Sequence, residues 1–217
     1  IVHVVLAKSD GAPAGVKGIS LFICPKFLVN KDGSVGERND VQLAGLLHKM
    51  GNRNTTSTVL NFGEQDGATA YLVGKPHHGL LYMFQMMNEA RLMVGANGVA
   101  TASVAYFAAL EYATTRRQGR SISNPSATSS APIIDHPDVR RMLLRQKAIV
   151  EGGAALLVQT GLYADHAAAG PTQQRPRAAG VLDILTPVAK SFPAEWGFES
   201  NSLALQVFGG YGYTTEY

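Results

Sequence analysis

The sequence predicts an α+β chain in which a β-rich first part is followed by a helical second part. Up to about residue 75, apolar residues occur in short runs bounded by turn-forming residues, which is typical of strands. From about residue 78 onward they recur at steps of three and four, the spacing of one helix face. The 217 residues are 46% hydrophobic and 16% charged, so the chain has enough apolar material for one large core or two small ones.

Two runs in the first part have the length and composition of strands. Residues 18–24 and 56–62 are rich in β-branched and aromatic side chains, which suit a pleated, half-buried surface. Between them, residues 30–33 and 51–52 carry the Asn and Gly residues that favour turns. We therefore expect several antiparallel strands.

A long helix is predicted over residues 78–116. Its apolar face continues through Gly95, Gly98 and Ala102, and such small residues let another helix approach closely. A helix of about 40 residues would be roughly 60 Å long, so we expect a break inside it.

A second helix is predicted from Pro137 to Ala169. Proline is favoured at the first helical position, and Asp138 places an acidic residue in the first turn. The pair 170–171 ends the pattern with Gly and Pro. Residues 121–132, before this helix, are rich in Ser, Pro and Ala, so we expect a mobile surface loop there.

A third helix is predicted to begin at the pair 186–187, where Thr is followed by Pro, and to continue to Val207. Pro193 lies inside this pattern and should kink the helix at a cost of about 3 kcal/mol. The glycine-rich run 209–212 should end the helix as a C-terminal cap and a turn.

The sequence excludes several kinds of site. The single Cys24 rules out a disulfide framework or a Cys-rich metal centre, and its apolar neighbours predict a buried, unreactive thiol. His77 and His78 are adjacent rather than helix-spaced and lack a carboxylate cluster, so no metal site is expected. The sequence also lacks the nucleophile elbow of serine hydrolases and the Walker A loop.

The apolar runs and the ends of the chain bear on its location. No membrane span is expected, because polar residues or glycines interrupt each apolar run. Residues 1–7 lack the basic start and the cleavage site of a signal peptide. Because the chain has no initiator Met and opens in a strand pattern, we expect it to be a fragment that stops at Tyr217.

The net charge of +3 is a modest excess of cations. We interpret it as a solvated face, with a site for anionic phosphates as the main alternative and nucleic acid as the weakest one. The nearest basic cluster comprises Arg140, Arg141, Arg145 and Lys147.

Two arginines stand out on the first predicted helix. Arg91 lies within an apolar face, where an unpaired guanidinium would be costly. It should therefore meet a carboxylate such as Glu89 or Glu111, a set of carbonyls, or a bound anion. Arg116 lies at the helix end, where its charge suits the negative end of the helix dipole.

Six segments, taken in order along the chain, resemble the acyl-CoA dehydrogenases. The last of them is the most specific, because it joins a Gln, a glycine pair and a Tyr-rich turn. Residues 136–143 and 48–51 are similar to the bacterial branch that acts on fatty or sulfur-containing acyl thioesters such as 3-methylmercaptopropionyl-CoA. The six segments are 18–23, 58–62, 71–74, 88–91, 112–116 and 206–217.

The resemblance implies a fold, a reaction and partners. Residues 1–76 would be the second part of a central β-sandwich or barrel-like domain, and residues 77–217 an incomplete antiparallel helical bundle. The family oxidises the Cα–Cβ bond of an acyl-CoA: a carboxylate removes the α proton and FAD takes the β hydride. The implied partners are an acyl-CoA, an electron-transfer acceptor and further copies in a dimer or tetramer, in the bacterial cytoplasm.

The resemblance also assigns roles to five residues. Arg116 aligns with the arginine that holds the FAD diphosphate of a neighbouring subunit, a task that suits a guanidinium. Gln206, Gly209 and Gly210 align with the turn that lies against the ADP part of the same FAD. Arg91 aligns with the arginine beneath the acyl-CoA site that helps to position substrate and base.

The sequence departs from the family pattern in ways that leave the base unassigned. The usual catalytic glutamate would follow residue 217, and Ala90 occupies the position that supplies the base in some branches. Glu89 is one position off and should point about 100° away on a helix, so no residue here is assigned as catalytic. Glu216 is interpreted as structural. Pro137 replaces a glutamine common in the family, which removes one expected contact to the adenine end.

Two other functions remain open at this stage. The same fold could serve a flavin oxidase, or an alkylation-response homologue that binds nucleic acid through its basic helix. Alternatively, the chain could be a helical assembly module that has lost flavin. Loss of FAD binding on replacing Arg116 would separate the flavin-dependent functions from this last one.

Overall fold

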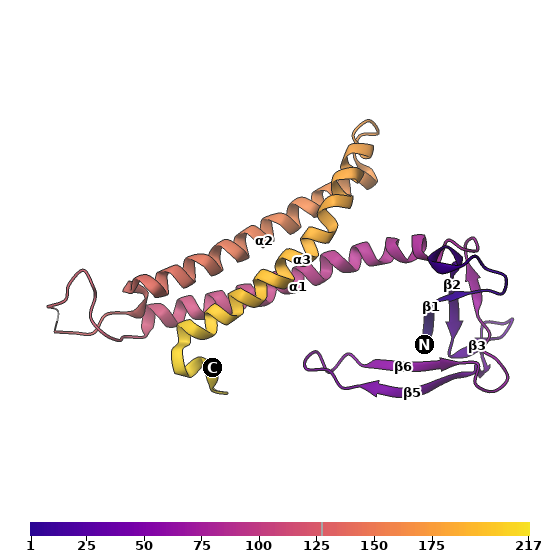
Figure 1. The fold of residues 1–217 in the computed structure, drawn as a ribbon, viewed down its shortest axis with the longest axis horizontal. Helices are drawn as coiled ribbons and strands as arrows, with labels where there is room; N and C mark the ends of the chain where they lie inside the picture. Colours follow the sequence, from indigo (N-terminus) through magenta and orange to yellow (C-terminus); the bar gives the residue numbers. More distant parts are fainter. Residues whose placement is uncertain (127) are drawn as a thin grey trace. The chain divides into compact units, whose positions relative to one another are not determined.

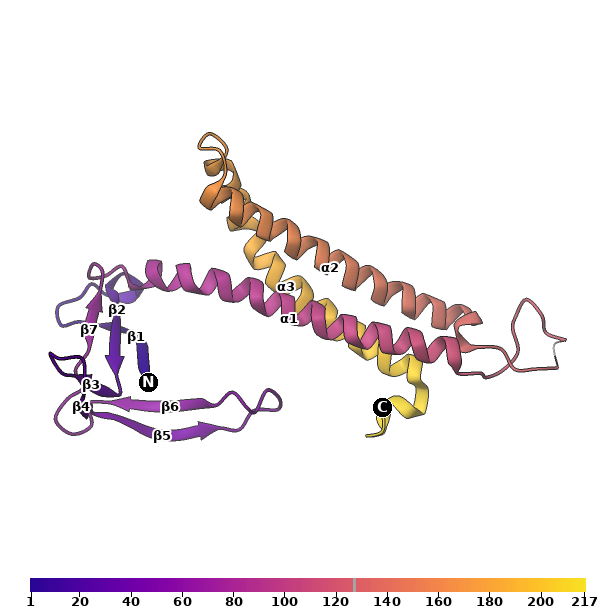
Figure 2. The same ribbon diagram turned by 180° about the vertical axis from the view of Figure 1, so that it is seen from behind.

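A computed structural model describes residues 1–126 and 128–217 of the chain (Figure 1, Figure 2). The described residues form two compact units, Ile1–Met86 and Met87–Tyr217, of which the first is rich in strands and the second is helical. The predicted α+β class is confirmed. The predicted domain limit between residues 76 and 77 stays a prediction. Ala127, in the predicted mobile loop, lies outside the described residues.

The first unit contains small antiparallel sheets. β2 is the central strand of a sheet with the order β1-β2-β7, while β3 pairs with β4 and β5 pairs with β6. The expected strands at 18–24 and 56–62 correspond to β2 and β6, and both expected turns connect hairpin partners. The strands are β1 Val2–Lys8, β2 Ile19–Pro25, β3 Phe27–Val29, β4 Val35–Arg38, β5 Val41–Leu47, β6 Ser57–Phe62 and β7 Tyr71–Val73.

A buried asparagine organises the core of this unit. Asn39 is 4% exposed, and its side-chain amide donates to the carbonyls of Pro25 and Thr69, each at 2.8 Å. Its side-chain oxygen accepts from the backbone N–H groups of Thr69 and Asp40. A buried polar group is tolerated when it is satisfied in this way. Cys24 beside it is buried as expected, and burial raises the pKa of its thiol.

The helical elements are α1 Gly79–Thr115, α2 Pro137–Ala169 and α3 Arg175–Phe208. The second helix matches its prediction at both ends, and the first continues without the expected break. α2 runs antiparallel to α3, since Arg145 pairs with Glu199 whereas Gly153 lies near Phe192. Short 3-10 turns occur at Gly15–Gly18, Ile133–Asp135 and Gly209–Tyr213.

Small residues bring α1 and α3 into backbone contact, as the sequence predicted. A Cβ built on Gly95 would lie 2.2 Å from the carbonyl oxygen of Ala189, and one built on Gly98 would lie 2.9 Å from that of Pro193. Ala102 on the same face is fully buried. These residues form what we call the α1–α3 seam.

The predicted start of the third helix is wrong. The helix begins at Arg175, with Pro176 in its first turn, rather than at Thr186. The hydroxyl of Thr186 donates to the Leu182 carbonyl one turn earlier, so this residue lies within the helix instead of capping it. The Thr-Pro pair therefore imitates a helix start in the sequence.

Both internal prolines of α3 have a structural explanation. A proline cannot donate to the carbonyl four residues earlier. Pro187 and Asp183 are both exposed, so the Asp183 carbonyl can bind water. Pro193 is fully buried, and the bare backbone of Gly95 covers the Ala189 carbonyl that Pro193 cannot bond.

The expectation of no membrane span stays a prediction, and α1 is the helix among the described residues that bears on it. By length and composition alone this helix is long and apolar enough, because an average over 18 residues tolerates isolated polar residues. Core helices of soluble proteins meet the same criterion, and α1 supplies Ala102, Tyr106, Ala109 and Ala113 to the core of the helical unit.

Candidate functional site

A pocket opens in the helical unit where α1 ends and α3 passes into the Gly209–Tyr213 turn. Its volume is about 320 Å³. It brings together three of the four residues expected to hold a cofactor: Arg116, Gly209 and Gly210. Its lining comprises Tyr112, Arg116, Gln118, Ile133, Val207, Phe208, Gly209, Gly210, Tyr211 and Thr214.

The backbone of Arg116 is held by hydrogen bonds, and its side chain is exposed. Its N–H donates to the Tyr112 carbonyl at 2.8 Å, and its own carbonyl accepts from Ile133 at 2.9 Å. The guanidinium lies 5.5 Å from the ring centre of Tyr211, a cation–π arrangement. The salt bridges found in the described part of the chain do not include Arg116. The pocket thus presents a cation that no carboxylate neutralises there.

Gly209 and Gly210 present bare backbone to open space. Gly209 has φ of +62°, which a residue with a Cβ adopts only at a cost, and it ends α3 as the predicted cap. A Cβ built on either residue would meet no described atom within 4 Å. By contrast, a Cβ on Gly212 would lie 2.4 Å from the Leu205 carbonyl oxygen. The space beside residues 209 and 210 is therefore available to a ligand.

Gln206 is not among the residues that line this pocket. Its side-chain amide nitrogen donates to the hydroxyl of Tyr213, which lies in the turn after α3. The hydrogen bond orients the amide and leaves the side-chain oxygen of Gln206 as an acceptor. Its predicted contact with FAD stays a prediction.

Arg91 lies far from this pocket. The step from residue 91 to residue 116 along α1 corresponds to about 37 Å, so the two arginines cannot serve one site within one chain. The Arg91 side chain is half-buried and donates to the side-chain oxygen of Asn88 at 3.3 Å. Its predicted role toward substrate remains untested.

Sequence reasoning missed the aromatic wall of the pocket. The ring centres of Tyr112 and Phe208, which both line the pocket, lie 4.5 Å apart. Tyr217 is outside this lining, and its ring centre lies 5.7 Å from that of Phe208 and 5.2 Å from that of Tyr211. Gln118 was also missed. The sequence offered one signal for these residues, which is that they lie close along the chain to predicted site residues. Tyr211 follows Gly210, and Gln118 lies two residues after Arg116.

The pocket suits the diphosphate of a dinucleotide such as FAD. A guanidinium supplies charge and paired donors, and glycine backbone allows close approach of phosphate oxygens. Aromatic rings beside it offer a surface for a flat group. In the described residues, no group of three or more His, Cys, Asp or Glu side chains could hold a metal ion. Glu89 is exposed on α1 and remains unassigned as a base.

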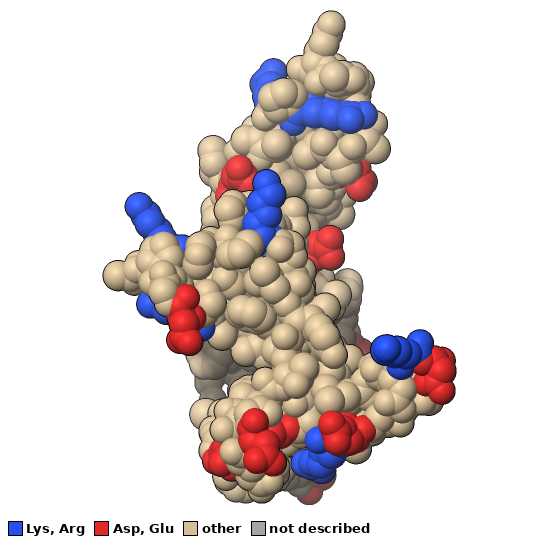
Figure 3. Space-filling view, turned by 90° about the vertical axis from the view of Figure 1, so that its right-hand side faces the viewer, with Lys and Arg blue, Asp and Glu red and all other residues tan. Residues whose placement is uncertain are grey.

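The basic residues of α2 are paired with acids. Arg140 meets Asp135 at 3.4 Å and Arg141 meets Asp138 at 2.9 Å. Arg145 and Lys147 pair with Glu199 and Glu151. On the face drawn in Figure 3, basic and acidic side chains are interspersed rather than gathered into one basic patch. These pairs support the solvated-face interpretation over nucleic-acid binding.

Comparison with known proteins identifies the family. The sequence model of the acyl-CoA dehydrogenase C-terminal domain matches residues 77–217. The chain belongs to the acyl-CoA dehydrogenase family. It is 46% identical over its full length to 3-methylmercaptopropionyl-CoA dehydrogenase of Ruegeria pomeroyi, and 39% identical to a broad-specificity linear acyl-CoA dehydrogenase of Mycobacterium tuberculosis. The resemblance predicted from the motifs is confirmed.

Solved structures confirm the fold and define how much of it this chain covers. Butyryl-CoA dehydrogenase from Megasphaera elsdenii superposes with a TM-score of 0.74 at 22% identity, over 100% of this chain and 48% of that one. The chain spans 36% of the length of each of the two curated relatives.

Proposed function

We propose that the protein takes part in the FAD-dependent α,β-dehydrogenation of an acyl-CoA thioester. The observation that carries the proposal is the meeting of Arg116 with the open backbone of Gly209 and Gly210 in one pocket. The motifs that predicted this meeting lie about 90 residues apart, so their convergence depends on the packing of α1 against α3. Relatives named as dehydrogenases of acyl-CoA substrates support the same reaction.

In this proposal the pocket holds the diphosphate and ADP part of FAD. Arg116 would bind the phosphate oxygens, while residues 209 and 210 let the backbone approach them. Gln206 would offer its side-chain oxygen to the ADP part, with the amide held by Tyr213. When bound, FAD supplies the acceptor for the β hydride. Arg91 would act at a separate acyl-CoA site, which explains its distance from Arg116 along α1.

The assembly of the enzyme is carried over from the family resemblance, in which the arginine aligned with Arg116 holds the FAD of a neighbouring subunit. The separation of Arg91 and Arg116 along one helix is compatible with an FAD at Arg116 that serves the acyl-CoA site of that neighbour. We therefore propose a homo-oligomer, with an electron-transfer protein as acceptor and a cytoplasmic location in bacteria. The β unit would be the 1–76 part of a central β-sandwich, and residues 77–217 the helical domain.

The proposal is tested on the purified intact protein by flavin content and turnover. We expect yellow protein that reduces an artificial electron acceptor when given saturated acyl-CoA, with a panel that includes butyryl-CoA and 3-methylmercaptopropionyl-CoA. A colourless protein with no flavin absorbance after FAD addition would contradict it.

A further inference from the structure

Another pocket of the helical unit lies at the opposite end of α3, where α2 and α3 are joined. Its volume is about 430 Å³, within the range of about 300–1,000 Å³ typical of small-molecule sites. It is separate from the pocket at Arg116, because α3 extends about 46 Å from Arg177 to Phe208 and the two linings share no residue. One small ligand therefore cannot occupy both pockets.

Polar side chains from both helices and their connection converge on this pocket. They supply a guanidinium, an imidazole, a phenol hydroxyl and two amides, and the lining, which lies wholly in the described range 128–217, contains no Asp or Glu. Asp165 precedes a lining residue on α2, but it points about 100° away from that residue. Such a set of donors favours an anionic ligand over a cation. The polar lining residues are Gln159, Tyr163, His166, Gln174 and Arg177.

These five side chains are not engaged within the protein. In the part of the chain that the structure describes, none of them makes a hydrogen bond or an ion pair with another residue. The four basic residues near the start of α2 differ, since each of them is paired with an acid. The paired donors of the Arg177 guanidinium therefore remain available to a ligand.

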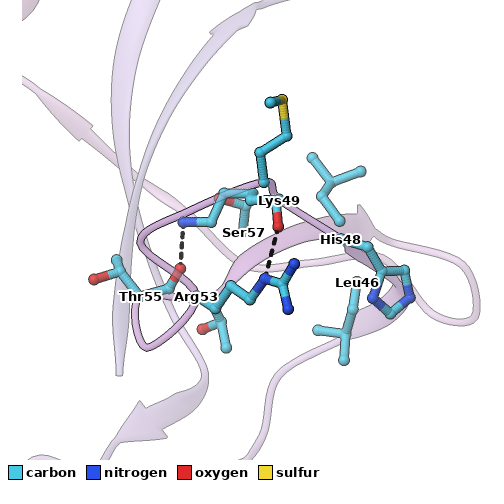
Figure 4. Close-up of a pocket in the computed structure, with 9 residues that line it drawn as sticks. Leu46, His48, Lys49, Arg53, Thr55 and Ser57 are labelled. Atoms are coloured by element: carbon cyan, nitrogen blue, oxygen red, sulfur yellow. Dashed lines mark hydrogen bonds between the residues drawn. The ribbon is translucent and has the colours of Figure 1, made fainter. Parts of the chain in front are cut away.

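The cations of a pocket at the β5–β6 loop are used differently (Figure 4). There the Nζ of Lys49 donates to the Thr55 carbonyl, and the Nε of Arg53 donates to the Lys49 carbonyl at 3.0 Å. These bonds hold the loop in shape. Among the described residues, Arg177 has no such partner that a ligand would have to displace.

The connection between α2 and α3 is held in place by its own hydrogen bonds. The Gly170 N–H donates to the His166 carbonyl at 3.0 Å, and the Nε of Arg175 donates to the Gly170 carbonyl at 2.7 Å. The Gln174 N–H donates to the Pro171 carbonyl at 2.8 Å. The backbone on this side of the pocket is thus ordered before a ligand binds, which lowers the entropic cost of binding.

One side of the pocket is less polar than the rest. The Tyr163 ring is half-buried, and Leu162 beside it is 48% exposed. An aromatic ring offers a surface on which a flat organic group can stack. An inorganic phosphate ion would reach the donors and leave this surface unused. A ligand that joins an anionic group to a flat organic part would use both sides.

We propose that the pocket between the end of α2 and the start of α3 binds a small phosphate monoester with a flat organic part. Arg177 binds the phosphate oxygens with two parallel donors, His166 supplies a further donor, and Tyr163 stacks on the organic part. The ligand joins the two helices at their connection and takes no part in the redox reaction. The inference does not depend on the proposed function.

The test uses phenyl phosphate, because this compound joins a phosphate monoester directly to a flat ring. Its binding to the whole purified protein is measured by calorimetric titration at fixed ionic strength, beside inorganic phosphate and phenol. We expect phenyl phosphate to bind at least about tenfold more tightly than either of the other two compounds. Binding no tighter than that of inorganic phosphate would overturn the proposal.

Substitutions locate the site. Arg177→Gln removes the guanidinium and should weaken phenyl phosphate binding about tenfold. Arg177→Lys keeps the charge but loses the paired donors, so it should retain part of the affinity. Tyr163→Leu should reduce the preference for phenyl phosphate over inorganic phosphate. The matched control is Lys190→Gln, which removes an exposed charge of α3 outside the lining and should bind the probe as the wild-type protein does.

Three results would contradict this site. Wild-type affinity in Arg177→Gln would show that the guanidinium does not bind the phosphate. Loss of affinity in Arg116→Ala alone would place the probe in the other pocket. Binding of anionic phospholipid vesicles that depends on Arg177, without binding of phenyl phosphate, would assign this residue to a membrane surface. Because none of these measurements requires flavin or turnover, this proposal and the proposed function fail separately.

Discussion

Glycines have different roles in two regions of the helical unit. In the α1–α3 seam, Gly95 and Gly98 face the backbone of the neighbouring helix so closely that a Cβ would overlap it. At the end of α3, Gly209 and Gly210 face space in which a Cβ would meet no described atom. The first pair serves packing and the second leaves room for a ligand. The same residue type therefore predicts a stability role in one region and a binding role in the other.

The largest effect is expected from Gly95→Ala. Its Cβ would lie 2.2 Å from the Ala189 carbonyl oxygen, a backbone atom that moves only if the helices separate. Overpacking of this kind should lower the free energy of unfolding by about 3 kcal/mol. Urea denaturation of the purified protein measures it.

The matched control is Gly152→Ala in α2, where a Cβ would meet no described atom within 4 Å. Alanine favours helix over glycine, so this variant should gain up to about 1 kcal/mol. A Gly95→Ala protein as stable as Gly152→Ala would show that the seam is not closely packed.

A smaller effect, of a different kind, is expected from Gly210→Ala. Because the added Cβ meets open space, the free energy of unfolding should change by less than about 0.5 kcal/mol. The methyl group would instead enter the space assigned to phosphate oxygens and lower FAD affinity about tenfold, or about 1.4 kcal/mol. Flavin titration and urea denaturation of one preparation separate the two quantities. A loss of stability with unchanged FAD affinity would contradict a binding role for Gly210 and indicate a packing role instead.

Structure and sequence agree best where local spacing decides the outcome. The period of three and four along α1 predicted its small-residue face, and the seam confirms it. The start of α3 could not be predicted in this way, because whether Pro187 begins or interrupts a helix depends on the solvent exposure of the Asp183 carbonyl.

The candidate site was only partly predictable for a similar reason. Resemblance supplied Arg116 and the pair 209–210, but not Tyr211 or Gln118. Their place in the lining depends on how the turn after α3 folds back toward the end of α1. That long-range packing leaves no periodic signal in the sequence.

The smallest effect is expected from Glu199→Gln, which removes the acid that pairs with Arg145 between α2 and α3. Exposed ion pairs contribute little, so the denaturation midpoint should stay within experimental error. The hydrogen bond and the charge of Glu199 raise the pKa of Arg145. A cation whose pKa is raised by folding stabilises the folded state fully at pH values below its ordinary pKa. That stabilisation is lost only as the pH rises through the raised pKa. The contribution of this arginine should therefore be constant through neutral pH, as unfolding at several pH values would show.

The most direct measurement compares FAD affinity in Arg116→Ala and Arg117→Ala. The two variants lose the same charge one residue apart, but only Arg116 lines the pocket, while Arg117 donates to the Ser130 carbonyl. We expect Arg116→Ala to bind FAD at least about tenfold more weakly, with its circular dichroism unchanged, and Arg117→Ala to bind it as the wild-type protein does. Equal FAD affinity in the two variants would contradict the assignment of this pocket to the cofactor.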